Sequence, residues 1–219
     1  MSDPFARRPR PVDVAVVDAR GRVSFEERRW PKALDAEALV AAFPVEPLDV
    51  VVVDGPQALA RPGASVREAE RLLRAPGRTP DVLPVPGKPF CGFVRGSVLL
   101  FAALHRLGTL EMLDVDTTEL GRARLFEAFP GATWRQWNVE KLGKKASPEG
   151  RATRRALLEA EGLCFPTGEL PTHDQLDATL CAWLGWLTRA APERVHAVGL
   201  PLRMDSEGWL REGRILDVS

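Results

Sequence analysis

Two runs of apolar, mostly β-branched residues stand out in the first quarter of the chain. Residues 12–18 read V-D-V-A-V-V-D, and residues 49–53 read D-V-V-V-V. Such runs are typical of strands that are covered on both faces, and therefore of the centre of a sheet. Residues 34–43 between them have helical spacing and end near Pro44. Because a helix between two buried strands is typical of a crossover, we expect the two strands to be parallel.

Turn and capping signals predict most of the remaining elements. Residues 22–30 alternate enough to form an antiparallel partner for the first strand. Ser65 and Thr172 each precede a Glu or Gln by three residues, which is the capping-box pattern, and Ser147 precedes a proline. We expect helices over 65–74, 96–107, 147–162 and 172–189, a strand over 124–129, a long loop over 75–90 and short strands after 195. Strands and helices interleave, so the sequence predicts an α/β or mixed α+β sheet domain.

Length and composition are those of an ordinary globular protein. A chain of 219 residues with 45% hydrophobic and 27% charged residues can bury a substantial core. We expect a flexible arm over residues 1–11 and one domain over residues 12–219. The apolar stretches are too short to cross a bilayer, and the arginine-containing N-terminus has no apolar segment behind it. We therefore expect a cytoplasmic protein without a membrane partner.

The charge balance excludes a general attraction to nucleic acid. The chain carries 30 basic and 30 acidic residues, so any contact with a polyanion needs a local patch. Arginine outnumbers lysine strongly and tyrosine is absent, which indicates the codon usage of a GC-rich bacterial genome. Cys91, Cys164 and Cys181 form no C-x-x-C pair, which argues against a zinc site and suits a reducing compartment.

Acidic residues stand at the ends of several predicted elements. Asp18 and Asp54 each follow an apolar strand, where open α/β sheets place their ligand sites. Glu127 lies in the third predicted strand, and Asp174 and Asp177 lie one turn apart on the last helix. Carboxylate oxygens gathered without cysteine are how proteins hold Mg²⁺ or Mn²⁺. Taken singly, each acid could also be a turn or helix-capping residue.

A basic segment follows the third predicted strand. Such a segment could follow a phosphate backbone or could form a solvated helix face. Trp134 and Trp137 nearby could stack on bases, whereas Trp183 is expected in the core. His173 could orient a water molecule or be an ordinary helix residue. The basic residues are Lys141, Lys144, Lys145, Arg151, Arg154 and Arg155.

Taken in order, the motifs resemble a family of predicted nucleases of unknown function. The motifs are Asp18, Asp54-Gly55-Pro56, Arg67-x-x-Glu70-Arg71, Glu127-Ala128-Phe129-Pro130, Lys145 and His173-Asp174-x-x-Asp177-Ala178. The resemblance covers residues 12–200 and implies a ribonuclease H-like mixed sheet with helices on both faces, similar to Holliday-junction resolvases. It implies that Asp18, Asp54, Glu127 and Asp177 are catalytic and that Asp18, Asp54, Asp174 and Asp177 bind metal. Arg67, Glu70 and His173 would support that site.

The sequence therefore predicts a nuclease that uses one or two Mg²⁺ or Mn²⁺ ions to hydrolyse phosphodiester bonds of DNA or RNA. The basic segment would position the nucleic acid. One alternative is a binding protein on the same fold, with the acids kept for a structural cation. Another is a hydrolase of small-molecule phosphates. Neither a G-x-S-x-G motif nor a phosphate-binding glycine loop is present.

Overall fold

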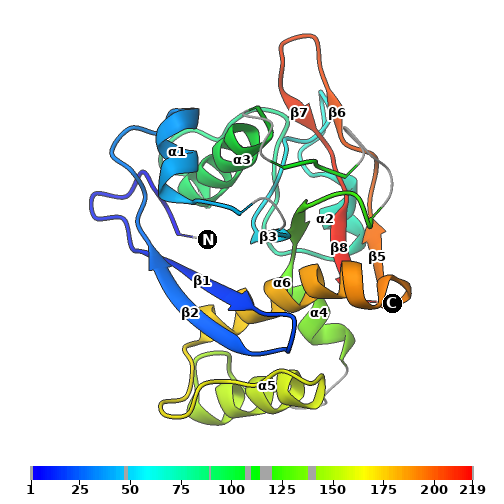
Figure 1. The fold of residues 1–219 in the computed structure, drawn as a ribbon. Helices are drawn as coiled ribbons and strands as arrows, with labels where there is room; N and C mark the ends of the chain where they lie inside the picture. Colours follow the sequence, from blue (N-terminus) through cyan, green and yellow to red (C-terminus); the bar gives the residue numbers. More distant parts are fainter. Residues whose placement is uncertain are drawn as a thin grey trace.

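A computed structural model describes residues 2–46, 49–88, 90–106, 110–113, 120–137 and 142–218 as a mixed α/β arrangement (Figure 1). The strands are β1 (Val12–Val17), β2 (Val23–Arg28), β3 (Val51–Asp54), β4 (Leu125–Ala128), β5 (Val195–Val198), β6 (Arg203–Met204), β7 (Leu210–Arg211) and β8 (Ile215–Val218). The helices are α1 (Ala36–Ala42), α2 (Glu68–Leu72), α3 (Cys91–Arg106), α4 (Pro130–Gln136), α5 (Pro148–Ala160) and α6 (His173–Ala190). Within these residues, none of the helices is both long and apolar enough to cross a membrane.

The main sheet has four strands in the order β3-β4-β8-β5. β3, β4 and β8 are parallel, and β5 runs antiparallel to β8 at the edge. The C-terminal strand β8 thus lies between β4 and β5. The sequence predicted short strands after residue 195 but not their position in the sheet. All four residues of β8 are buried, as its internal position requires.

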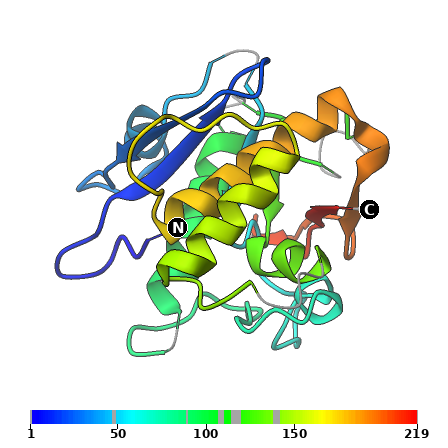
Figure 2. The ribbon, with the colours of Figure 1, turned by 90° about the horizontal axis from the view of Figure 1, so that it is seen from below.

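Helices cover both faces of this sheet. On one face, α6 packs with Leu180 and Leu184 against Val52 and Phe126. Figure 2 shows α5 lying alongside α6, on the outside of the molecule. On the other face, Leu39 of α1 and several residues of α3 form a second core with the alternate residues of β3 and β4. The predicted mixed sheet with helices on both faces is confirmed at this level.

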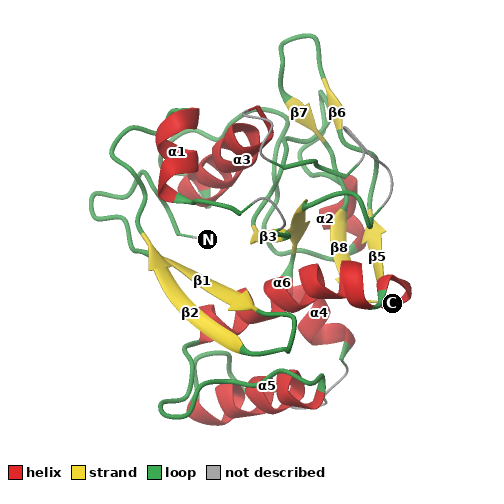
Figure 3. Cartoon of the chain, in the orientation of Figure 1, coloured by secondary structure: helices red, strands yellow, loops and turns green. Residues whose placement is uncertain are grey.

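The first strand is not central in the main sheet, and this prediction was wrong. β1 pairs with β2 in a two-stranded sheet, and residues of β1 other than Val12 are only partly buried or exposed. Figure 3 shows this hairpin set apart from the strands of the main sheet. In the described residues β1 and β3 form no ladder, so their expected parallel pairing is absent. Both strands instead pack on α6, which explains why each is apolar.

The caps of the long helices confirm the sequence signals, while α2 departs from them. The Thr172 hydroxyl accepts from Gln175 N–H at 3.1 Å, and the Gln175 side chain accepts from Thr172 N–H at 2.9 Å. Ser147 caps α5 in the same way through Gly150 N–H at 3.1 Å. α2 begins after Arg67 rather than at Ser65. The Glu70 carboxylate of α2 itself accepts from Arg67 N–H at 3.3 Å, and the distant Glu212 carboxylate accepts from Glu68 N–H at 2.9 Å.

The N-terminal arm lies along α3 instead of standing free. Ser2 is buried, and its hydroxyl accepts from the Trp30 indole N–H at 2.8 Å. The arm crosses α3 where that helix has glycine: a Cβ at Gly96 would come within 2.7 Å of Pro4. The structure thus places the arm against a small-residue face of α3, and its flexibility stays a prediction from composition.

Candidate active site

Asp54 and Asp177 come together at the carboxyl end of β3. Asp54 is the last residue of β3 and is half-buried, while Asp177 lies on the buried face of α6 in line with Cys181. The Asp177 Oδ2 forms an ion pair with the ammonium group of Lys145, from the loop before α5. Two carboxylates and one ammonium group from three separate segments therefore share one partly buried place. Of the four acids predicted to be catalytic, the structure brings Asp54 and Asp177 together here.

The electrostatics of this group follow from burial and mutual charge. Burial raises the pKa of Asp54, and the negative charge of Asp177 raises it further. Burial lowers the pKa of Lys145, but the charge and hydrogen bond of Asp177 and the charge of Asp54 outweigh it, so this pKa is raised. The pKa of the Cys181 thiol is raised by its burial and by the same two carboxylates. Lys145 stays protonated, and it offsets part of the repulsion between the acids.

Trp134 and Arg154 support Asp177 from the side of α4 and α5. The Trp134 indole N–H donates to Asp177 Oδ1 at 2.8 Å, and Trp134 is buried. The Arg154 guanidinium lies 5.6 Å from the Trp134 ring centre and donates to Leu142 O at 3.0 Å and Gly150 O at 2.9 Å. Trp134 is therefore not available to stack on a base, which corrects one of the readings of the sequence. Its ring packs on Trp137, which packs on Trp183 in the core.

Glu127 lies on the opposite face of the sheet from Asp54. The register of β3 and β4 sets Val53 opposite Glu127 and Asp54 opposite Ala128. Because directly opposite residues share a face and neighbours along a strand alternate, Asp54 and Glu127 point to different sides. The expectation that Glu127 joins the other acids is therefore wrong, because the register of β3 and β4 places the Glu127 and Asp54 side chains on opposite faces of the sheet.

Glu127 instead belongs to a buried ion-pair network around Arg67. The fully buried Arg67 guanidinium donates to Glu127 Oε2 at 2.6 Å and Oε1 at 2.5 Å, and to Glu70 Oε1 at 3.1 Å. Glu127 Oε2 also accepts from Gln57 N–H at 2.9 Å, and Glu70 Oε2 from Thr79 N–H at 2.9 Å. Burial raises the pKa of Glu127, although Arg67 opposes this effect. Arg67 and Glu70, expected to support the acidic site, hold loops together on the other face.

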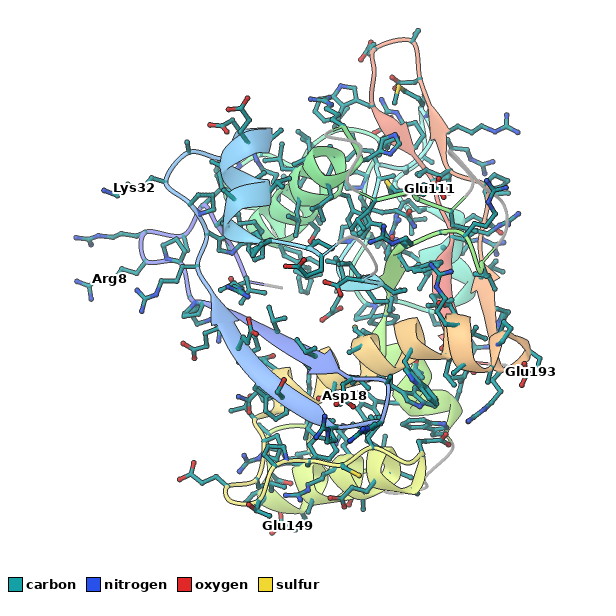
Figure 4. The ribbon with its side chains drawn as sticks, viewed as in Figure 1. Arg8, Asp18, Lys32, Glu111, Glu149 and Glu193 are labelled. Atoms are coloured by element: carbon teal, nitrogen blue, oxygen red, sulfur yellow. The ribbon has the colours of Figure 1, made fainter. Side chains whose placement is uncertain are left out.

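Asp18 lies in the turn of its own hairpin, as Figure 4 shows. Its carboxylate accepts from Arg20 N–H at 2.8 Å and Arg22 N–H at 3.0 Å, and pairs with the Arg22 guanidinium at 2.7 Å. The backbone bond from Arg22 contributes most to a pKa that is lowered from its usual range. The structure thus places Asp18 as a turn residue and does not gather it with Asp54 and Asp177.

A second group of acids lies beside the start of α6, and two of its members, Asp13 and Glu27, were not among the predicted site residues. Asp13 of β1 is paired directly across the hairpin with Glu27, and both line a small pocket with His173 and Asp174. Burial, with the charges of Asp174 and Glu27, raises the pKa of Asp13. The Asp174 Oδ1 lies 3.0 Å from the His173 Nδ1. A lone acid within an apolar strand was the signal in the sequence that could have identified Asp13.

The basic segment is only partly available to a ligand. Arg154 is buried as described, and Arg155 pairs with Glu159 at 2.8 Å on the same helix. Arg151 Nη1 donates to two carbonyl groups of the loop before α6, Leu170 O and Pro171 O, each at 3.1 Å. Lys144 is exposed, and Lys141 lies outside the described residues. Among the five predicted basic residues that the structure describes, the side chains do not form one continuous basic face.

The carboxylate oxygens of this group suit a hard cation, but Asp177 is already paired with the Lys145 ammonium group. Asp54, Asp174 and Asp177 offer carboxylate oxygens, which Mg²⁺ and Mn²⁺ prefer. Both Asp177 oxygens already have partners, Trp134 and Lys145. Within the described ranges, no three His, Cys, Asp or Glu side chains are placed to hold a metal ion. An ion at this place would therefore exchange with the Lys145 ammonium group.

The chain belongs to the family described as protein of unknown function (DUF429), whose model matches residues 7–199. No curated protein and no solved structure matches the chain.

Proposed function

We propose that this member of the DUF429 family is a divalent-metal-dependent nuclease with a ribonuclease H-like fold. Three features support the fold: a mixed sheet with helices on both faces, an acid at the end of parallel strand β3, and a last helix that carries Asp174 and Asp177. The strand β1 would complete the sheet in such a fold. Its separation from β3 is a departure from the expected arrangement.

The observation that carries the activity is the meeting of Asp54 and Asp177 beside Lys145. Two carboxylates held close in a partly buried place repel each other, and proteins keep such an arrangement where a cation or a substrate relieves it. Asp54 and Asp177 would hold the ion, with Asp174 as the third oxygen ligand. When bound, the ion would supply a water molecule of lowered pKa and neutralise charge on the phosphate.

The residues around the acids have defined roles in this proposal. Trp134 fixes the orientation of the Asp177 carboxylate through its 2.8 Å hydrogen bond, so that only Oδ2 faces the ligand. Lys145, released from Asp177 by the ion, would bind a phosphate oxygen, and the exposed Lys144 next to it would contact the backbone. Nucleic acid would therefore approach along the loop before α5, at the carboxyl end of β3.

The test is cleavage of single- and double-stranded DNA and RNA by the purified protein with Mg²⁺ or Mn²⁺. Asp54→Asn should abolish cleavage while the circular dichroism spectrum stays that of the wild type. Asp49→Asn is the matched control, because Asp49 is an exposed aspartate in the loop before β3, and this variant should retain activity. Equal activity in Asp54→Asn and wild type would exclude this site as the source of cleavage.

A second candidate function is binding without catalysis, and Lys145 favours it. Its ammonium group already neutralises Asp177, which a stable binding protein would need and an ion-dependent enzyme would have to displace. The two functions differ in one measurement: a nuclease gains thermal stability from millimolar Mn²⁺ through Asp54, whereas the binding protein does not.

A further inference from the structure

A cavity lies between strands β1 and β3. Its volume is about 920 Å³, and residues of both strands line it together with one face of α6. Ala178, Ala182 and Gly185 on that face are small residues, and Trp186 and Arg189 of the same helix also line the cavity. A cavity of this size is typical of ligand sites. The proposed metal ligands Asp54, Asp174 and Asp177 are among its lining residues, but the proposed nuclease function gives no role to the two strands that border it.

Two walls of the cavity are edges of β-sheets, namely β1 of the hairpin and β3 of the main sheet, which pair with no further strand among the described residues. Asp18 N–H donates to Arg22 O at 3.1 Å, and the Val23 N–H points away from β1 to Cys164 O at 2.9 Å. Main-chain groups of an antiparallel pair alternate in direction, so those of Ala15 and Val17 point away from β2. Both residues line the cavity, and the described residues add no second strand to this edge.

The edge of β3 is arranged in the same way. Val51 N–H donates to Arg124 O at 2.8 Å, toward β4. Alternation then directs the main-chain groups of Val50 and Val52 away from β4, and both residues line the cavity. Two rows of main-chain donors and acceptors therefore border one cavity, which is the setting in which an extended peptide adds a strand.

The charge of the lining selects the kind of peptide. Eight acidic residues and three arginines line this cavity, counted over the described residues. Asp13 and Glu27, which lie opposite each other across the hairpin, are among these acids. Like charges directly opposite destabilise a β-pair, so a cationic occupant would relieve them. The remaining walls are largely valine, which suits apolar side chains at alternate positions.

We propose that the cavity between β1 and β3 binds an extended, lysine- or arginine-rich segment of a partner protein, which adds a strand between the two edges. Main-chain hydrogen bonds to Ala15, Val17 and Val52 would provide affinity, and the acids would select basic side chains. A strand rises about 3.3 Å per residue, so the six-residue β1 matches a peptide of about six residues. Asp54, Asp174 and Asp177 line this cavity as well, so the peptide site overlaps the proposed metal site, but the two strand edges on which it rests do not depend on the nuclease function.

The test uses a fluorescein-labelled peptide of alternating lysine and valine, seven residues long, and fluorescence polarisation in buffer with chelator and no nucleic acid. We expect saturable binding, and none for the same peptide with glutamate in place of lysine. Peptides N-methylated at single internal positions should bind about three- to tenfold more weakly, the effect of losing one main-chain hydrogen bond. If N-methylation leaves the affinity unchanged, the peptide is bound by charge alone and not by main-chain hydrogen bonds, and the proposal of an added strand is overturned.

Variants of the protein test the same contact from the other side. Ala15→Pro removes an N–H that points away from β2, which an edge strand tolerates, and should weaken binding by a similar factor. Ala15→Ser keeps that N–H and is the matched control. Because Ala15→Pro could fail to fold, amide hydrogen exchange of the wild type gives an independent readout.

In the exchange experiment, the amides of Ala15 and Val52 should exchange rapidly in the free protein and become protected with the peptide. Protection of both amides without peptide would show that β1 and β3 pair with each other, and would overturn the proposal. A dimer in light scattering, with the same amides protected, would assign the edges to a second copy of the chain and would also overturn it. Asp54 lines the cavity as well as the proposed metal site, so Asp54→Asn does not serve to separate the two proposals. Peptide binding is measured in chelator without nucleic acid, and cleavage is measured without peptide, so each proposal can fail while the other holds.

Discussion

The indole N–H of Trp134 donates to the Oδ1 of Asp177 at 2.8 Å, inside the molecule and between two helices that are far apart in the sequence. This bond decides how Asp177 is used. One carboxylate oxygen is committed to the protein, and the other faces Lys145 and the carboxyl end of β3. The aromatic ring that supplies the N–H is itself packed on Trp137, so the donor is fixed in direction.

Trp134→Phe should destabilise the protein by about 1–3 kcal/mol, because it leaves a buried carboxylate oxygen without its donor. Thermal or urea unfolding measures this loss. Trp137→Phe is the control, since Trp137 is only partly buried and belongs to the same aromatic cluster. Equal losses in both variants would mean that packing, and not the hydrogen bond, accounts for the effect.

Asp54 should make the stability of the metal-free protein depend on pH. Its pKa is raised in the folded state, so above the ordinary range of aspartate the folded protein binds more protons than the unfolded chain. Stability from this group is therefore present at acidic pH and declines as the pH rises through the raised pKa. Asp54→Asn should remove this decline and make the chelated protein more stable at pH 7–8. Urea titrations at several pH values measure it, and a steeper decline in the variant would contradict the assignment.

Arg67→Met should destabilise the protein by about 3–5 kcal/mol, because Glu70 and Glu127 would remain buried without their cation. Arg71→Met is the matched control, on the helix that Arg67 precedes. Arg71 pairs with Glu68 on the surface, so its loss should change the free energy of unfolding very little. Chemical unfolding of the two variants gives the comparison, and a tolerated Arg67→Met would show that the buried network is not needed for the fold.

Lys145→Gln should tighten Mn²⁺ binding by about tenfold or more, because the ion would no longer compete with an ammonium group for Asp177. The same change should lower nuclease activity if Lys145 binds the phosphate. Isothermal titration with Mn²⁺ measures the first effect, and Lys144→Gln serves as the neighbouring control. Weaker Mn²⁺ binding in Lys145→Gln would place the ion elsewhere.

Asp18→Asn should leave both the response to Mn²⁺ and any cleavage unchanged. The Asp18 carboxylate is held by Arg20 and Arg22 within its own turn, and asparagine retains the oxygen that accepts from the backbone. The measurement is the melting temperature with chelator and with Mn²⁺, beside Asp54→Asn. If Asp18→Asn abolishes the response, the hairpin must move to bring β1 to β3 when the ion binds.

The elements with strong local signals were predictable from the sequence. Thr172 and Ser147 begin helices because their side chains bond to N–H groups three residues away, and such contacts need no partner from elsewhere in the chain. The placement of Asp177 beside Cys181 on the buried face of α6 follows in the same way from the helical period. β1, β3 and β4 were likewise recognisable as apolar runs.

What the sequence by itself determined, then, was the position of most strands and the starts of the two helices that Ser147 and Thr172 cap. The tertiary structure decided which of the acids meet. The register of β3 and β4 places Glu127 on the face of the sheet opposite Asp54. The Asp18 carboxylate instead pairs with Arg22 in the turn of its own hairpin. A loop distant in sequence brought Lys145 to Asp177. The reason is physical: helix period and caps act over a few neighbouring residues, whereas register and the pairing of charges depend on segments that only the folded chain brings together.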